Sequence, residues 1–330
     1  VAVIAGFLLT AVGNWTKRET LVGAPLLALA ALWVAGRFAI LLAAVLPRGV
    51  VAAVDLAFLQ ALGIALARPL VATRNWRNFV MLLLVVALFA ANAATHLGAL
   101  GLTRLGVARR ACWVAIDLIV GLMLIMAARV VPMFTRNGTG SKTIHTYPAL
   151  DVAAPALVGV LALVDAIFWQ STATAIVAGL AALATLGRAA RWGTLATARH
   201  PLLWILHAGH AWIAIGLALR ALSFVWPAAS GSLAVHALTA GAIGSLTLGM
   251  MARVSLGHTG RPLAAGKTIT AAFAFVTLAA VARAIVPIFA PARYLLFLEI
   301  AASLWSVAFL LYLVIYIPIL VAPRADGKPG

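Results

Sequence analysis

Four histidines lie inside long apolar stretches of this sequence, where an imidazole can do chemistry that its neighbours cannot. They are His96, His207, His210 and His236. Desolvation disfavours the charged form of the ring, so a histidine at membrane depth keeps a neutral nitrogen that can bind a metal ion. A hydrogen-bonded core histidine is the alternative for each. His207 and His210 are three residues apart, which permits one shared metal, although no acid accompanies them.

The stretch that begins at His236 and reads HALTAGAIGSLTLGMMARVSLGHTGRP combines a histidine with a face of small residues. Ala237, Gly241, Ser245 and Gly249 recur at every fourth position. Small residues at this spacing let two helix backbones approach closely, which is how helices associate in lipid. The sequence therefore predicts that this face packs against another helix, with His236 on the adjoining face.

The composition is that of a polytopic membrane protein. Of 330 residues, 65% are hydrophobic and 9% are charged, and the mean hydropathy is +1.12, so a soluble domain of this length could not bury the apolar surface. The net charge of +17 comes from basic residues at the ends of apolar segments, so we expect no nucleic-acid partner. The single cysteine, Cys112, excludes an intrachain disulfide, and no nucleotide-binding or acyl-transfer motif is present.

We predict an all-α fold, with residues 1–322 as a transmembrane helical domain and residues 323–330 as a cytoplasmic tail. Lipid-exposed segments must satisfy their own backbone polar groups, which favours helices. The first apolar run, residues 1–13, is too short to cross a hydrocarbon core of about 30 Å, so we expect it to be part of a span. One further helix before it would complete a bundle of twelve. Ten full spans follow, near residues 23–46, 50–67, 78–101, 110–134, 149–169, 172–188, 200–222, 232–253, 267–290 and 293–321.

Basic residues predict the orientation. In the connections and at the adjoining span ends, 15 lysines and arginines stand on the side of the odd-numbered connections and the tail, and 5 on the side of the even-numbered ones. The richer side is expected to be cytoplasmic. An aromatic residue or histidine followed by threonine and a basic residue recurs three times on that side, at Trp15, Phe134 and His258. Three four-helix units would explain this spacing, and chance similarity between loops is the alternative.

Seven charged residues inside the spans lie between the middle and the predicted outer end. Burying a charge at membrane depth costs at least about 2.5 kcal/mol, so this one-sided distribution favours a hydrated or cofactor-filled outer cavity. Pairing across helices is the alternative for each individual charge. The residues are Asp55, Asp117, Asp165, Glu299, Arg37, Arg220 and Arg283.

Three blocks of the sequence resemble the NnrS family, which consists of haem- and copper-containing bacterial inner-membrane proteins of nitric oxide metabolism. They are the residues from 1 to 37, the block ARVVPMFTRNG and the stretch that begins at His236. The resemblance implies twelve spans and a His-rich segment just before the point where this chain begins. The general plan of haem-copper oxidases and nitric oxide reductases is similar.

The resemblance implies haem b, with copper as a second metal, and nitric oxide as the molecule handled. Family-pattern histidines fall on His96, His207, His236 and His258, of which the first three are the candidate metal ligands. His210 stands where an aromatic residue is expected, so its role is open.

Six of the seven charged residues in the outer half can then be given a role. Arg37, Arg220 and Arg283 are candidate partners of haem propionates, while Asp55, Asp117 and Glu299 are candidate proton carriers. Reduction of nitric oxide with electrons from quinol is one interpretation. A non-enzymatic carrier of metal, haem or small solutes, or a nitric oxide sensor, is the other.

The charge asymmetry gives a testable orientation. Single cysteines placed at Arg74 and at Arg109, with Cys112 replaced by alanine, should react with membrane-impermeant reagents from opposite sides, Arg74 from the cytoplasm. Labelling of both from the periplasm would contradict the topology.

Overall fold

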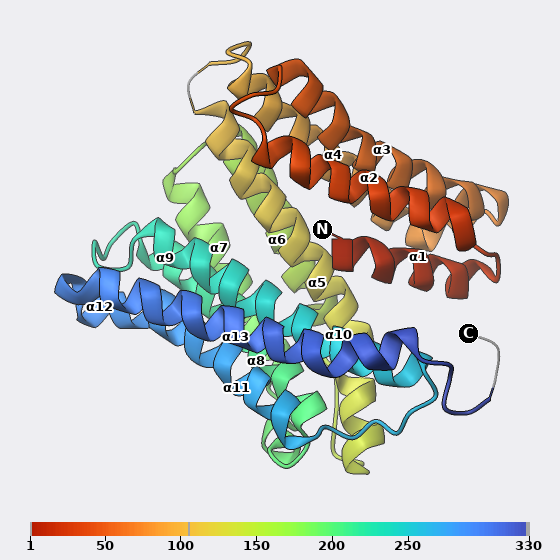
Figure 1. The fold of residues 1–330 in the computed structure, drawn as a ribbon. Coiled ribbons are helices and arrows are strands. Elements are labelled where there is room, and N and C mark those ends of the chain that lie inside the picture. The colour runs from red at the N-terminus through yellow and green to blue at the C-terminus, as the bar shows by residue number, and fades with distance from the viewer. Residues whose placement is uncertain (1, 105, 328–330) are drawn as a thin grey trace. The chain divides into compact units, whose positions relative to one another are not determined.

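All the regular secondary structure is helical in the part of the chain that the computed structural model describes, residues 2–104 and 106–327 (Figure 1). Ten helices there are long and apolar enough to cross a membrane, and the shorter α1, Ala2–Thr16, precedes them. This confirms the predicted all-α membrane fold with eleven apolar segments. The ten are Gly23–Leu41, Arg48–Ala72, Trp76–Ala99, Val107–Thr139, Pro148–Ile167, Thr172–Ala189, Pro201–Leu222, Gly231–His258, Lys267–Phe289 and Pro291–Val321.

Most of these spans are single α-helices, but two are interrupted. The span Gly231–His258 runs through α9 (Gly231–His236), the π-helical segment η3 (Ala237–Ile243) and α10 (Gly244–His258). The span Lys267–Phe289 runs through α11 (Lys267–Ala280), the π-helical segment η4 (Val281–Ile285) and α12 (Val286–Phe289). The uninterrupted helices are α2 (Gly23–Leu41), α3 (Arg48–Ala72), α4 (Phe79–Ala99), α5 (Val107–Thr139), α6 (Pro148–Ile167), α7 (Thr172–Ala189), α8 (Pro201–Leu222) and α13 (Tyr294–Val321).

The helices divide into two compact units. Unit 1 comprises residues 1–122 with 165–167, and unit 2 comprises residues 123–164 and 168–330. Within unit 1, α3 packs against α1, α2 and α4. Within unit 2, α8 packs against α7, α9, η3 and α10, while α11 packs against α13. The arrangement in three four-helix units stays a prediction.

Several helices extend beyond the predicted spans. The helix α3 ends at Ala72 rather than near residue 67, and α10 ends at His258 rather than near residue 253. Arginines therefore lie on the last turns of helices instead of in the connections, because long basic side chains can follow a helix out of the hydrocarbon core. Arg253 lies five residues before the end of α10, and its guanidinium is 4.0 Å from the centre of the Phe134 ring.

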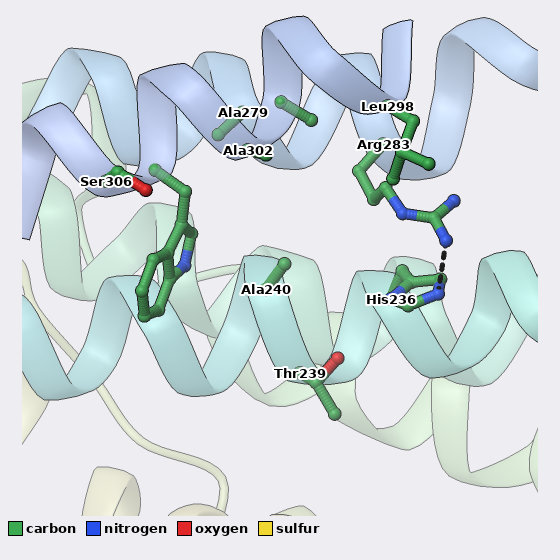
Figure 2. A pocket seen from close by; sticks show the side chains of 10 residues that line it. His236, Thr239, Ala240, Ala279, Arg283, Leu298, Ala302 and Ser306 are labelled. Atoms are coloured by element: carbon green, nitrogen blue, oxygen red, sulfur yellow. Dashed lines mark hydrogen bonds between the residues drawn. The ribbon is translucent and has the colours of Figure 1, made fainter. Parts of the chain in front are cut away.

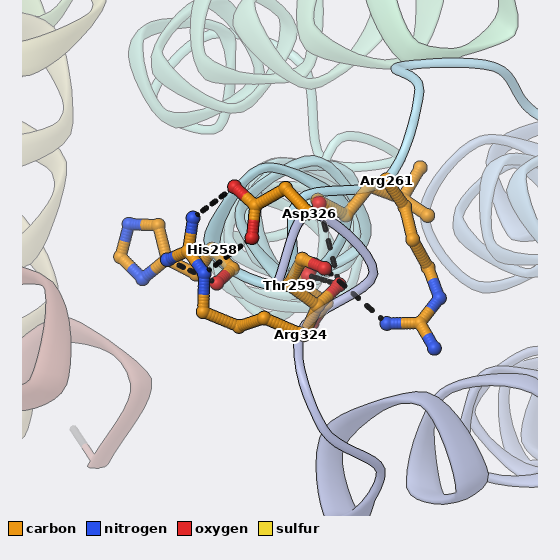
Figure 3. A network of polar contacts seen from close by, with 7 residues as sticks. His258, Thr259, Arg261, Arg324 and Asp326 are labelled. Atoms are coloured by element: carbon orange, nitrogen blue, oxygen red, sulfur yellow. Dashed lines mark hydrogen bonds and ion pairs between the residues drawn. The ribbon is translucent and has the colours of Figure 1, made fainter. Parts of the chain in front are cut away.

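The tail begins by folding back on the end of α10 (Figure 3). Arg324 Nη1 donates to the carbonyl of His258 at 3.0 Å, and the backbone N–H of Ala325 donates to the carbonyl of Thr259 at 2.9 Å. These donors satisfy carbonyls that a helix end leaves without partners. Asp326 pairs with Arg324 at 2.6 Å and raises the pKa of that guanidinium.

The small-residue face of η3 and α10 packs against α8 as predicted. Gly241 lies against Trp212, and Gly249 lies against Ile205, so that a Cβ on either glycine would come within 2.7 Å of its neighbour. The partner helix contributes glycines of its own. A Cβ on Gly209 would lie 2.6 Å from Leu246 Cγ and 3.0 Å from its backbone nitrogen. Close backbone approach therefore joins these helices.

This close approach predicts that Gly209→Ala destabilises unit 2 by about 1–3 kcal/mol, because the added methyl group overpacks the contact with Leu246. The matched control is Gly257→Ala on α10, where nothing lies within 4 Å of a Cβ and alanine favours the helix. Thermal unfolding in detergent should show a lower midpoint for the first variant only. Equal midpoints would contradict the packing.

Candidate functional site

The closest pairing of a predicted histidine with a predicted arginine lies in unit 2. Nη2 of Arg283 is 2.6 Å from Nε2 of His236 (Figure 2). A guanidinium can only donate, so Nε2 of His236 accepts and the proton of the neutral ring is assigned to Nδ1. The lone pair on Nε2 of His236 therefore accepts a hydrogen bond from Arg283.

A cavity of about 400 Å³ adjoins this pair. Its wall is mostly apolar and includes Ala240, Ala279 and Ala302, whose small side chains leave space between η3, α11 and α13 (Figure 2). The volume is within the range of small-molecule and cofactor sites, which are typically apolar with a few polar groups. Here the polar groups come from His236 and Arg283, together with Thr239 and Ser306.

One N–H group of Arg283 is left without a hydrogen-bond partner among the described residues. Its Nη1 is buried and makes no hydrogen bond within the described residues, although the guanidinium also lies 5.3 Å from the centre of the Tyr294 ring. A buried donor without a partner costs about 1–3 kcal/mol, or more when it is charged. An acceptor in the adjoining cavity would remove that cost.

Both residues stand at interruptions of the α-helical pattern. His236 is the last residue of α9, directly before η3, and Arg283 is the central residue of η4. The π-helical geometry adds one residue to a turn, so it shifts the side chains that follow, and it occurs often at functional sites. Sequence periodicity gave no signal for either segment.

A second histidine site lies in unit 1, around the carboxylate of Asp55. Oδ2 of Asp55 accepts from Nδ2 of Asn92 at 2.7 Å and lies 2.9 Å from Nε2 of His96. Oδ1 accepts from Nη2 of Arg37. Asp55 is only 4% exposed, so these three donors compensate for removing its charge from water.

Local packing brings this cluster together. Gly36 on α2 faces α3 so closely that a Cβ would lie 3.3 Å from the Cα of Asp55. The absence of a side chain at Gly36 lets α2 and α3 approach closely, which brings the next residue, Arg37, to the carboxylate. His96 lies three residues before the end of α4, near the end of its span.

The partner of His96 determines which nitrogen is available. The aspartate accepts from Nε2, so Nδ1 of the neutral ring carries the free lone pair. A carboxylate behind a histidine is the usual arrangement for a metal ligand, since it fixes the ring and makes the opposite nitrogen more basic. His96 thus has the chemistry of a ligand, and sequence reasoning did not pair it with Asp55.

His207 has both ring nitrogens occupied. Thr135 Oγ1 donates to the carbonyl of Val131 at 2.8 Å, so it accepts from Nε2 of His207 at 2.9 Å. Nδ1 of His207 then accepts from Thr194 Oγ1 at 3.0 Å. Metal binding by His207 would require one of these bonds to break, so its role as a ligand stays a prediction.

His210 lies beside a buried ion pair that sequence reasoning missed. Its Nε2 donates to the carbonyl of Thr185 at 3.1 Å, and its ring centre lies 4.6 Å from that of Trp192. Next to Trp192, the fully buried Arg188 donates to Asp151 Oδ1 at 3.1 Å. The pair links α6 to α7 inside unit 2, and the contact of His210 with Trp192 fits the aromatic residue expected at this position.

Comparison with known proteins gives one match. A model of the NnrS family, described as NnrS protein, matches residues 1–324. The chain belongs to the NnrS family. This confirms the resemblance seen in the sequence, and family membership suggests a role in nitric oxide metabolism. Searches of curated proteins and of solved structures gave no match.

The remaining predicted residues of this NnrS-family protein lie on α5, α6, α8, α10 and α13. Asp117 on α5, Asp165 on α6 and Arg220 on α8 are buried. His258 is exposed at the end of α10. Glu299 is exposed on the surface of α13.

Metal binding by His96 and His236 stays a prediction. His96 belongs to unit 1 and His236 to unit 2, and each has its own partner within its unit. Within the residues that the structure describes, no three His, Cys, Asp or Glu side chains form a group that could hold a metal ion.

The Asp55 cluster predicts a measurable difference between two ion pairs. Asp55→Ala leaves the donors of Arg37, Asn92 and His96 without their acceptor, so it should lower the free energy of unfolding by about 3–5 kcal/mol, and by less if Arg37 turns to the surface. Asp326→Ala removes a solvent-accessible pair and should have a much smaller effect. Chemical unfolding in detergent checks this, and equal effects would contradict the assignment.

Proposed function

We propose that this NnrS-family protein binds haem b in the cavity beside His236 and handles nitric oxide there. The observation that supports the proposal is the conjunction of a histidine, an arginine with an unused donor and a mostly apolar cavity of about 400 Å³. Haem needs an axial nitrogen, an apolar space for its ring and a cation for its propionates.

The residues at this cavity fit those needs. His236 would supply the axial nitrogen and Arg283 would pair with a propionate, so the hydrogen bond between them would be exchanged for two new interactions. The alanines on α11, α13 and η3 leave room for a flat ring. When bound, haem supplies an iron with an open position for a diatomic gas. Nitric oxide is apolar enough to reach a site inside the bilayer without a polar channel.

Reduction of nitric oxide is the finer part of the proposal. It would require electrons from a membrane donor such as quinol, together with protons carried by this chain. Glu299 is a candidate because it follows Leu298, which lines the cavity, on α13. Asp117 is buried and is a second candidate. Asp55 is engaged by three donors, so it would serve as the partner that orients His96.

His96 is the candidate ligand for a further metal, and copper is proposed for it. Its Nδ1 lone pair faces no described hydrogen-bond donor, and imidazole suits copper. Among the described residues, His96 does not belong to a group of three His, Cys, Asp or Glu side chains that could hold a metal ion. The remaining ligands would therefore have to be other groups.

The proposal predicts a coloured protein. Full-length protein expressed with sufficient haem should show a Soret band, and His236→Ala should abolish the band or shift it. Arg283→Gln should weaken haem binding by roughly 10-fold or more, because a charged hydrogen bond to the propionate is lost. His200→Ala, an exposed histidine, is the control and should leave haem content unchanged.

Pyridine-haemochrome analysis measures haem content, and a nitric oxide electrode with reduced quinol measures turnover. Consumption of nitric oxide beyond one equivalent per haem would support reduction. Stoichiometric binding without turnover would leave a binding or protective role and end the reductase proposal. Colourless protein with no haem would contradict the proposal as a whole.

A further inference from the structure

A second cavity lies within unit 1, between α2 and α3. It has a volume of about 370 Å³ and is lined by apolar residues of both helices. Arg68 of α3 is the one charged residue among those that line it. The apolar wall includes Pro25, Ala28, Leu29, Leu32, Ala61 and Ala65.

The position of Arg68 gives this groove a direction. Arg68 lies four residues before the end of α3, about 6 Å from its end, and Ala61 lies about 10 Å deeper along the same helix. On α2, Pro25 stands near the start of the helix and Leu32 about 10 Å further along. The groove therefore runs from a basic mouth at the membrane surface into the apolar interior.

Further cations gather around the mouth. An adjoining cavity of about 580 Å³ is lined by Lys17, Arg18 and Glu19 of the connection between α1 and α2, and Leu21 lines both cavities. The connection between α3 and α4 is tied to the same end, because Asn75 Nδ2 donates to the carbonyl of Trp15 at 3.3 Å. That connection carries Arg74 and Arg77, so five cations accompany one acid.

These cations are available to a ligand. Across residues 2–104 and 106–327, no ion pair or side-chain hydrogen bond engages Lys17, Arg18 or Arg68. By contrast, Arg37, Arg188 and Arg283 each have a partner inside their unit. The mouth of the groove is thus a patch of unneutralised positive charge beside an apolar slot.

We propose that this groove binds an anionic phospholipid, with an acyl chain between α2 and α3 and the headgroup phosphate at Arg68. The apolar slot suits a hydrocarbon chain, and arginine suits phosphate, which it can contact through two N–H groups at once. Basic pockets between transmembrane helices are a recognised kind of site for anionic headgroups. Lys17 and Arg18 favour a headgroup of net negative charge over a zwitterionic one.

The charge and the slot can be tested separately. Purified full-length protein in nanodiscs of mixed phosphatidylglycerol and phosphatidylcholine is transferred to mild detergent, and retained lipid is measured by native mass spectrometry. The wild type should retain phosphatidylglycerol preferentially. Arg68→Gln should lower its apparent affinity about fivefold, the effect of one charge near an anionic membrane surface. Ala28→Trp should lower retention as well, because the indole fills the slot without changing the charge.

The matched control is Arg293→Gln, which removes an exposed arginine of unit 2 and should leave retention unchanged. Thermal unfolding of each variant separates lipid loss from misfolding, and Arg68→Gln at an exposed position is expected to fold. Equal retention of the two lipids, or unchanged retention in Arg68→Gln, would overturn the proposal. Displacement of the lipid by inorganic phosphate would also overturn it, since the chain in the slot would then contribute nothing.

Discussion

The absence of water in the hydrocarbon core is the constraint on which the rest of this structure depends. A polar group there must find its partner within the protein, because leaving it unpaired costs several kcal/mol. The backbone meets this demand by forming helices. The buried side chain of Asp55 meets it by pairing with residues of neighbouring helices. Arg188 pairs with Asp151 and Arg283 with His236, but Nη1 of each arginine has no described partner, so each meets the demand only in part. At Arg283 a ligand in the adjoining cavity could complete the pairing.

Close packing and open space occur side by side on the span that contains η3. Gly241 and Gly249 let α8 approach on one face, where even one methyl group would not fit. His236 and Ala240 line the cavity on another face. Lipid gives helices little hydrophobic reason to associate, so tight contact through glycine is what holds the span in place. The rigidity of that contact is what allows a cavity to persist next to it.

The spans and the packing face could be predicted from the sequence, because both follow from periodic patterns of apolar and small residues. The helix ends could not, since arginines such as Arg68 and Arg253 extend helices beyond the apolar core. The ion-pair partners of buried charged residues could not be predicted from the sequence either. Asp151 and Arg188 are 37 positions apart, and nothing in either position identifies the other. The π-helical geometry at Arg283 depends on the tertiary environment, so the α-helical pattern of the sequence does not reveal it.

The three predicted ligand histidines differ in the chemistry of their partners. An acceptor, Asp55, leaves the other nitrogen of His96 free to bind a metal. A donor, Arg283, occupies the lone pair of His236 until another acceptor draws the guanidinium away. Two hydroxyl groups occupy both nitrogens of His207. An anionic ligand such as a propionate would therefore free His236 at the moment that it engages Arg283. Ligand binding and exposure of the axial nitrogen would then be one coupled event rather than two.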